Sequence, residues 1–223
     1  MSALPDPLGQ AARWVKRGGL LAFPTETVWG LAADARSDAA VERLRRWKGR
    51  DADQPVSVLV ENVAAAEAHG AVFPAPARLL ADAFWPGPLT LIVPNRGAFA
   101  AGVARADGAV GLRCSSHPLT GALVRRLEGE GAGPATATSL NRSGQPPAAT
   151  RGAARACCES PGRVAGAPRD LDAPRLLDVE GAECGADEPT TVVDATEQPP
   201  RVLRWGAIDS RALEPLLSEW RGV

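Results

Sequence analysis

The chain has 223 residues, 45% of them apolar and 23% charged, with a formal net charge of −1 at pH 7, which suits a globular protein that folds as one domain over residues 1–223. The near-neutral charge argues against a protein that coats nucleic acid through bulk positive charge, although a local basic groove is compatible with it. No apolar run approaches the ~20 residues of a membrane span, and the first residues lack the pattern of a secretory signal, so we expect a cytoplasmic protein with no membrane partner.

Apolar periodicity and turn residues predict interleaved helices and strands. Several connections are too short for regular βαβ crossovers, so we expect an α/β fold with a mixed sheet. Residues 160–175 and 181–189 are rich in Gly, Ala, Pro and charge, which predicts surface segments that could act as lids. In chain order, we expect helix 6–17, strand 20–23, helix 38–47, strand 56–60, helices 64–69 and 75–84, strands 89–93 and 109–113, helix 118–127, strand 135–139, helix 150–158, strands 176–179, 191–194 and 202–204, and helix 209–220.

The cysteines and histidines form no metal-binding or disulfide pattern. None of the four cysteines makes a C-x-x-C pair, and Cys157 and Cys158 are adjacent. His69 and His117 lie far apart in the sequence. We therefore expect reduced thiols and no metal held by the protein itself.

Residues 20–31, with the sequence LLAFPTETVWGL, place polar side chains at the end of a buried strand. Thr25, Glu26 and Thr27 form a turn there, and open α/β sheets bind ligands beyond the carboxyl ends of their strands. Gly30 allows the backbone to bend or to approach a neighbour closely. The alternative is an ordinary turn in which a threonine caps a helix.

Further cations, hydroxyls and amides lie at the ends of other predicted elements. Each has a plain structural explanation by itself, as a helix-end charge, a turn residue or a strand former. We nevertheless expect them to converge on a site, because separate explanations would require several coincidences. They are Lys48 and Arg50 at a helix end, Gln54 beyond it, Arg113 and Arg204 at strand ends, Thr190 before a strand, and Ser139 and Asn141 in TATSLNRSG.

This set of residues favours binding and charge neutralisation over nucleophilic catalysis. Neither histidine lies in a recognisable triad setting, and no paired carboxylates are evident. Cationic, hydroxyl and amide groups instead suit a polyphosphate together with a small zwitterion.

Seven segments, in order, resemble the YrdC-type threonylcarbamoyl-AMP synthases. They extend from about residue 10 to about residue 210, and a match of this many segments is stronger evidence than any single motif. The most specific part is the K-x-R and S-x-N set, here Lys48, Arg50, Ser139 and Asn141. The segments are FPTETVWGL, KGR, FWPGPLTLIVP, GLRCSSHP, TSLNRSGQPPA, TTVVD and LRWGAI.

The resemblance implies a YrdC-like fold, a twisted mixed sheet with flanking helices around a basic cavity. It also implies a nucleotidyltransferase that converts L-threonine, bicarbonate or CO2, and ATP with Mg2+ into threonylcarbamoyl-AMP, pyrophosphate and water. A downstream threonylcarbamoyl-transferase complex would use this product to make threonylcarbamoyladenosine (t6A) in tRNA, and the cavity would allow contact with tRNA or double-stranded RNA. Because LRWGAI lies near the end of the chain, we expect the short, single-domain form of the family.

The resemblance further implies roles for individual residues. Thr27, Arg113 and Thr190 would bind threonine, whose carboxylate suits an arginine fork. Lys48 and Arg50 would be catalytic, because two cations and Mg2+ would relieve the negative charge of the α-phosphate before a carbamate attacks it. The ATP-binding residues would be Lys48, Arg50, Gln54, Ser139, Asn141 and Arg204.

Three positions depart from the family pattern. Trp29 stands where Tyr or Phe is usual, Leu59 where many members have His near the amino acid, and Pro147 where a polar residue is common. These departures bear on the choice of amino acid more than on adenylation, and threonine remains the expected substrate.

Two other functions fit the same residues. One is a relative of the same fold that carbamoylates another substrate, as in hydrogenase maturation proteins, although their acylphosphatase and zinc-finger regions are not visible here. The other is an RNA-binding module without catalysis. The joint presence of Lys48, Arg50, Ser139 and Asn141 argues against the second.

Overall fold

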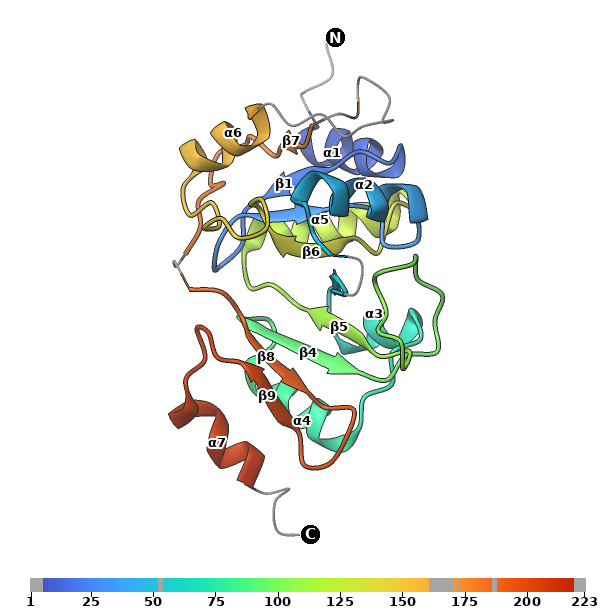
Figure 1. The fold of residues 1–223 in the computed structure, drawn as a ribbon, viewed down its shortest axis with the longest axis vertical. Coiled ribbons are helices and arrows are strands. Elements are labelled where there is room, and N and C mark those ends of the chain that lie inside the picture. The colour runs from blue at the N-terminus through green and yellow to red at the C-terminus, as the bar shows by residue number, and fades with distance from the viewer. Residues whose placement is uncertain (1–5, 52–53, 161–170, 172, 186–187, 219–223) are drawn as a thin grey trace.

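The computed structural model describes residues 6–51, 54–160, 171, 173–185 and 188–218 of the chain. A nine-stranded sheet in the order β7-β1-β2-β6-β3-β5-β4-β8-β9 extends along the molecule (Figure 1). The pairs β1/β7, β3/β5 and β4/β8 are parallel and the others antiparallel, so the predicted mixed sheet is confirmed. The strands are β1 (Leu21–Phe23), β2 (Gly30–Ala32), β3 (Ser57–Leu59), β4 (Leu89–Val93), β5 (Val110–Arg113), β6 (Thr136–Ser139), β7 (Arg175–Leu176), β8 (Thr191–Asp194) and β9 (Arg201–Arg204).

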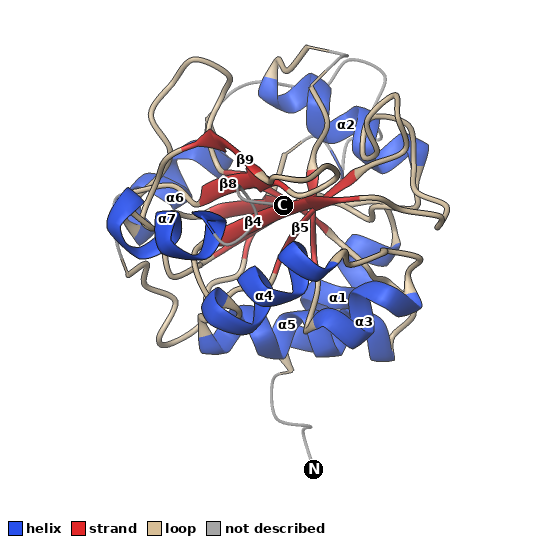
Figure 2. Ribbon diagram, turned by 90° about the horizontal axis from the view of Figure 1, so that it is seen from below, coloured by secondary structure: helices blue, strands red, loops and turns tan. Residues whose placement is uncertain are grey.

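Helices flank the sheet, with α1, α3, α4 and α5 together on one side and α2 on the other (Figure 2). Asp6 Oδ1 accepts a hydrogen bond from the Gly9 amide at 2.8 Å and begins α1, and Ser37 caps α2 in the same way. Gly49 ends α2 in the left-handed conformation, with a φ of 64°, which a side chain would strain. Within the described ranges, no helix is both long and apolar enough to span a bilayer. The helices are α1 (Pro7–Lys16), α2 (Asp38–Lys48), α3 (Val63–Ala68), α4 (Ala75–Phe84), α5 (Pro118–Gly129), α6 (Arg151–Glu159) and α7 (Ser210–Ser218).

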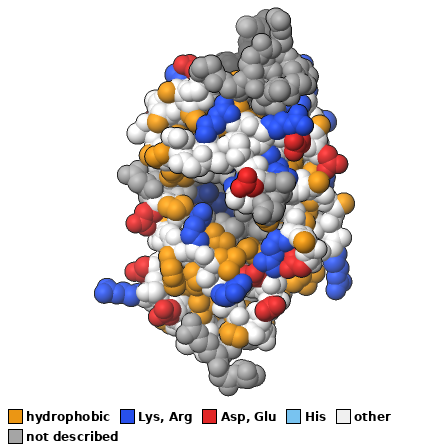
Figure 3. All heavy atoms as spheres, in the orientation of Figure 1, with side chains coloured by type: hydrophobic (Ala, Val, Ile, Leu, Met, Phe, Trp, Pro, Cys, Tyr) orange, Lys and Arg blue, Asp and Glu red, His pale blue; other side chains and the backbone are white. Residues whose placement is uncertain are grey.

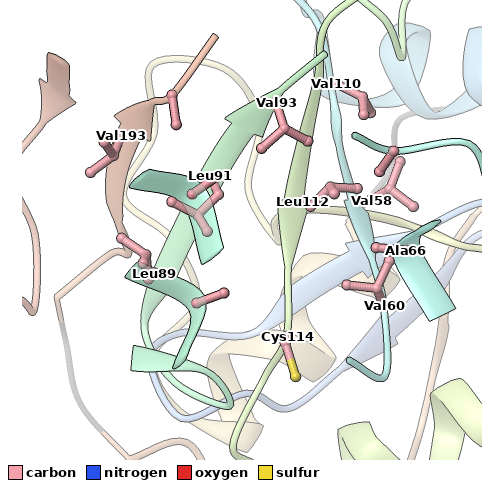
Figure 4. Close-up of a cluster of buried hydrophobic side chains, with 14 of the residues drawn as sticks. Val58, Val60, Ala66, Leu89, Leu91, Val93, Val110, Leu112, Cys114 and Val193 are labelled. Atoms are coloured by element: carbon pink, nitrogen blue, oxygen red, sulfur yellow. The ribbon is translucent and has the colours of Figure 1, made fainter. Parts of the chain in front are cut away.

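Alternation of side chains along β4 separates a core face from a polar face. Leu89, Leu91 and Val93 lie in a buried cluster with side chains of β5, β8, α3 and α4 (Figure 4). The intervening Thr90 and Ile92 point the other way and line a cavity. This follows from the two-residue period of a strand, and it leaves the face opposite α3 and α4 open to a ligand.

β2 is a strand that the sequence prediction lacks. It covers three residues and begins with a glycine, which is unfavourable in strands, so no local pattern indicates it. Gly30 pairs with Phe23 of β1, and a Cβ built on Gly30 would lie 2.4 Å from the Phe23 ring. The glycine is therefore required by the close approach of that ring.

Predictions for the last third of the chain are only partly tested. The predicted strand 176–179 is shorter and earlier, because β7 pairs with β1 only at Arg175 and Leu176. Residues 161–170, 172, 186 and 187 of the expected lid segments lie outside the described residues, as do 219 and 220 of the expected last helix. A lid role for 160–175 and 181–189 stays a prediction.

Candidate functional site

A cavity of about 620 Å³ lies on the open face of the sheet. Its walls come from the turn after β1, from the chain after α2, and from β4, β5, β6, β8 and β9. Figure 3 shows basic side chains gathered around a hollow in this part of the surface. Six of the nine predicted site residues line it: Thr27, Arg50, Arg113, Ser139, Thr190 and Arg204.

A β-bulge directs the end of β9 into the cavity. Val192 pairs with Arg204 and Val193 pairs with Val202, so Leu203 is an extra residue on β9. An extra residue interrupts the alternation of side chains. Val202 consequently packs against the core, whereas both Leu203 and Arg204 line the cavity.

Arg113, at the end of β5, is held by the turn that follows β1. Its Nη2 donates to Thr25 Oγ1 at 3.0 Å, to Glu26 Oε1 at 3.0 Å and to Thr27 Oγ1 at 2.6 Å. The side chains of Arg113 and Glu26 are only 12% and 14% exposed, so solvent screens this ion pair weakly. The other oxygen of Glu26 accepts a hydrogen bond from Ser115 Oγ. Nε of Arg113 is buried without a partner among the residues that the structure describes.

Arg204 and Thr190 form another part of the wall. Nε and Nη2 of Arg204 donate to the Thr190 carbonyl at 3.2 and 2.8 Å, and Nη2 also donates to Thr190 Oγ1 at 3.1 Å. Thr190 Oγ1 lies 2.9 Å from Thr90 Oγ1 on β4. Burial lowers the pKa of Arg204, and the charge of Arg113 lowers it further. An arginine stays protonated despite such a shift, so the cavity holds concentrated positive charge.

Lys48 ends α2 and lies behind the cavity wall, with 3% of the residue exposed. Its Nζ donates to the carbonyl oxygen of Ser139, to that of Asn141 at 3.0 Å and to Asn141 Oδ1 at 2.8 Å. Ser139 Oγ donates to the same Oδ1 at 2.7 Å. Burial, and secondly the charge of Arg50, lowers the pKa of Lys48 to about 7. Three oxygen acceptors nevertheless match the three N–H groups of an ammonium and favour the charged form.

Arg50 follows α2 and reaches the cavity. Its Nε donates to the Gln54 carbonyl at 3.1 Å and its Nη2 to the Pro55 carbonyl at 3.0 Å. Burial lowers the pKa of Arg50, and the charges of Arg45 and Arg204 add to this effect. The guanidinium thus both shapes the loop after α2 and contributes charge to the cavity.

Three predicted residues do not line the cavity. Lys48 and Asn141 form the support behind Ser139, and Gln54 is an exposed residue that meets Arg50 through its backbone. Their ATP-binding roles stay predictions. Among the positions that depart from the family pattern, Trp29 and Pro147 line the cavity, whereas Leu59 packs in a core cluster with side chains of α1 and α5.

Sequence reasoning did not select four polar residues of the cavity wall: Ser57, Thr90, Arg105 and Thr138. Arg105 lies between β4 and β5, and it donates to Asp107 Oδ1 at 3.1 Å and to Asp194 Oδ2. No local signal separates Arg105 from an ordinary surface charge. Thr90 could have been found, because it alternates with the apolar residues of its strand and so points away from the core.

The side chains of the site suit an anion better than a bare metal ion. No group of three or more His, Cys, Asp or Glu that could hold a metal occurs in the described part of the chain. Glu26, the acidic group of the β1 turn, is already engaged by Arg113 and Ser115. The guanidinium of Arg113 lines the cavity and carries only donors, which match a carboxylate or a phosphate.

Several known proteins are similar to this chain in sequence. The Sua5/YciO/YrdC family model, described as "Telomere recombination", matches residues 13–206. Threonylcarbamoyl-AMP synthase of Pyrococcus abyssi is 32% identical over 211 residues and that of Bacillus subtilis 33% over 214, each covering 95% of this chain and 57% of the relative. The putative threonylcarbamoyl-AMP synthase of Mycobacterium tuberculosis H37Rv is 35% identical over 203 residues, which cover 91% of this chain and 85% of that protein. This chain therefore spans little more than half the length of the first two relatives.

Solved structures share the fold. The P. abyssi Sua5 complex with L-threonine superposes with a TM-score of 0.81 at 30% identity, covering 96% of this chain and 58% of the other. Escherichia coli YciO gives a TM-score of 0.74 at 20% identity, covering 93% and 94%, which is evidence of the fold alone. The predicted YrdC-like fold is confirmed by these matches.

Proposed function

Because the chain belongs to the Sua5/YciO/YrdC family, we propose that it is an L-threonylcarbamoyladenylate synthase. The reaction converts L-threonine, bicarbonate or CO2, and ATP into threonylcarbamoyl-AMP, pyrophosphate and water. Relatives at 32% and 33% identity bear the name threonylcarbamoyl-AMP synthase, which supports this activity.

The observation that carries the proposal is that the three arginines selected from the sequence converge on one cavity. Arg50, Arg113 and Arg204 come from three separate parts of the chain and all line it. Burial lowers the pKa of Arg50 and of Arg204, the charges of Arg45 and then Arg204 lower that of Arg50 further, and the charge of Arg113 lowers that of Arg204 further. A protein stabilises such a cluster poorly by itself, whereas polyphosphate and carboxylate groups would compensate it.

Threonine is assigned to the Arg113 wall. The guanidinium of Arg113 would donate to the carboxylate of the amino acid, and Thr27 and Thr190 would contact its other polar groups. The P. abyssi relative was solved in complex with L-threonine, which supports an amino-acid site on this fold.

ATP is assigned to the wall that contains Arg50 and Arg204. The Ser139–Asn141 turn, fixed from behind by Lys48, would present hydrogen-bonding groups to the nucleotide, with Gln54 at the rim. Arg50 is the proposed catalytic cation, because it lines the cavity and would lower the negative potential at the α-phosphate. Lys48 would act through the turn at Ser139 and Asn141 that it supports. No acidic cluster occurs among the described residues, so Mg2+ is expected to enter with the phosphates of ATP, as part of that substrate.

The proposed chemistry requires positioning more than acid–base groups. The threonine amine and bicarbonate form a carbamate and release water. A carbamate oxygen then attacks the α-phosphorus of ATP, and pyrophosphate leaves with the electron pair of the broken P–O bond. The arginines hold the two anions together and reduce their repulsion. A threonylcarbamoyl-transferase complex that makes t6A in tRNA is the proposed consumer of the product.

ATP–pyrophosphate exchange with the purified chain tests the proposal. Exchange should require both threonine and bicarbonate. Serine should support it less well, because losing one buried methyl costs ~1 kcal/mol. Valine should be the poorest, because an unpaired polar group in the site costs ~1–3 kcal/mol. Equal activity with valine and threonine would contradict recognition of the hydroxyl, and no dependence on any amino acid would favour carbamoylation of a different substrate.

A further inference from the structure

Glu26 lies behind the cavity wall and contacts a residue that lines it. Its Oε1 lies 3.0 Å from Nη2 of Arg113, and its side chain is 14% exposed. Glu26 is not among the residues that line the cavity, so a ligand there would meet Arg113 rather than Glu26.

The hydroxyl protons of the turn are already committed. Thr25 Oγ1 donates to the Val28 carbonyl at 2.7 Å, which uses its one proton. The 2.9 Å contact between the Thr25 and Thr27 hydroxyls therefore has Thr27 as the donor. Both threonines consequently present only lone pairs to Arg113, and they cannot by themselves neutralise its charge.

Glu26 supplies the only formal charge among the three oxygens that hold Nη2. Glu26 is itself held by Ser115, whose Oγ donates to Glu26 Oε2. Ser115 Oγ in turn accepts a hydrogen bond from the His117 amide at 3.2 Å. The start of α5 therefore orients Glu26, and Glu26 orients Arg113. A buried charged contact of this kind restricts a long side chain to one position more strongly than neutral contacts do.

We propose that Glu26 is a positioning residue, which holds Nη2 of Arg113 against the turn and so keeps the guanidinium in the position from which it can donate to the carboxylate of the amino-acid substrate. Glu26 thereby sets the affinity for the amino acid without contacting it. This inference rests on the proposed function, since it takes the carboxylate ligand of Arg113 to be threonine.

Calorimetric titration of threonine and of ATP into Glu26→Ala, Glu26→Gln and the unmodified chain tests the proposal. Glu26→Ala should weaken threonine binding about tenfold or more, which corresponds to ~1.4 kcal/mol, and leave ATP binding within about twofold. Glu26→Gln should lose less threonine affinity than Glu26→Ala, because the glutamine amide oxygen still accepts a hydrogen bond from Arg113. Glu61→Gln is the matched control: Glu61 also pairs with an arginine, Arg125, at 3.6 Å, but the two side chains are 40% and 58% exposed, so threonine binding should not change.

Two results would overturn the positioning role: unchanged threonine affinity in both Glu26 variants, or equal loss of threonine and ATP affinity. Failure of the unmodified chain to bind threonine would instead count against the proposed function. A crystal structure of Glu26→Ala without ligand separates the two cases. It should show the Arg113 guanidinium displaced from the Thr25 and Thr27 hydroxyls, and an undisplaced guanidinium would refute the role of Glu26 whatever the substrate.

Discussion

Two cations near the cavity are used in different ways. Arg113 lines the cavity, pairs with Glu26 through Nη2 and keeps an unpaired Nε. Lys48 lies behind the wall, and its Nζ is surrounded by three oxygens of the turn at Ser139 and Asn141. Arg113 is therefore held where a ligand can contact it, whereas Lys48 stabilises the backbone of the turn.

The difference follows from the number of donors on each side chain. A guanidinium has five N–H groups in a rigid fork, so it can satisfy the scaffold with some and a ligand with the rest. An ammonium has three, and in Lys48 all three are used by oxygens of the protein. The role of a cation at a site therefore depends on which donors remain once the fold is formed.

Removing Arg113 should have the largest effect, because Arg113 serves both scaffold and ligand. In Arg113→Met, Glu26 stays buried without its partner, and we expect a loss of ~3 kcal/mol in the free energy of unfolding and near-complete loss of threonine binding. Adding Glu26→Gln should restore part of the stability but none of the binding. Denaturant unfolding and calorimetry measure the two effects, and threonine binding by Arg113→Met would contradict the assignment.

Arg50→Ala should reduce activity strongly while leaving the stability of the protein nearly unchanged. We expect adenylate formation to fall by ~100-fold, the scale of losing one preorganised charge contact. Stability should change by ~1 kcal/mol or less, because Arg50 donates only to two loop carbonyls. Arg46→Ala, which removes an exposed arginine paired with Glu42 on the same helix, is the control and should keep its activity. An active Arg50→Ala enzyme would refute the catalytic role.

Lys48→Met should reduce the stability of the protein more than Arg50→Ala does. The substitution leaves the oxygens of Ser139 and Asn141 without their donor, and an unsatisfied buried acceptor costs ~1–3 kcal/mol. ATP affinity should fall with the loosened turn, and threonine affinity should not. Thermal unfolding with separate titrations of the two ligands measures this, and equal loss of both ligands would indicate general misfolding of the turn.

The pH dependence of stability gives the smallest and most specific comparison. The pKa of Lys48 is lowered from 10.5 to about 7 by burial and then by Arg50. Between these values the unfolded chain binds one proton more than the folded chain, so the stability of the wild type should rise relative to Lys48→Met as the pH increases. The slope is at most ~1.4 kcal/mol per pH unit. If the free energy of unfolding changes equally with pH in the wild type and in Lys48→Met from pH 7 to 10, the three oxygens keep the ammonium charged in the folded state.

Local patterns predicted three of the regular elements with the bounds that the structure shows. The predicted elements 75–84, 89–93 and 191–194 coincide with α4, β4 and β8. β2 was missed because its three buried residues carry no period. The strand predicted at 176–179 was found at 175–176, because the extent of β7 is set by its pairing with β1. Arg105 was missed because a single arginine in a loop looks the same whether it faces solvent or a cavity.

The sequence by itself determined most of the elements and their order, the mixed sheet, the family and the set of cations and hydroxyls available to a site. Only the tertiary structure decided which of those groups face the cavity and which of their donors remain unpaired. The reason is the long range of the deciding contacts: Arg113 meets Thr27 across 86 residues, and Lys48 meets Ser139 across 91. Local propensity carries no information at such separations, because these hydrogen bonds form only after the sheet has brought its strands together.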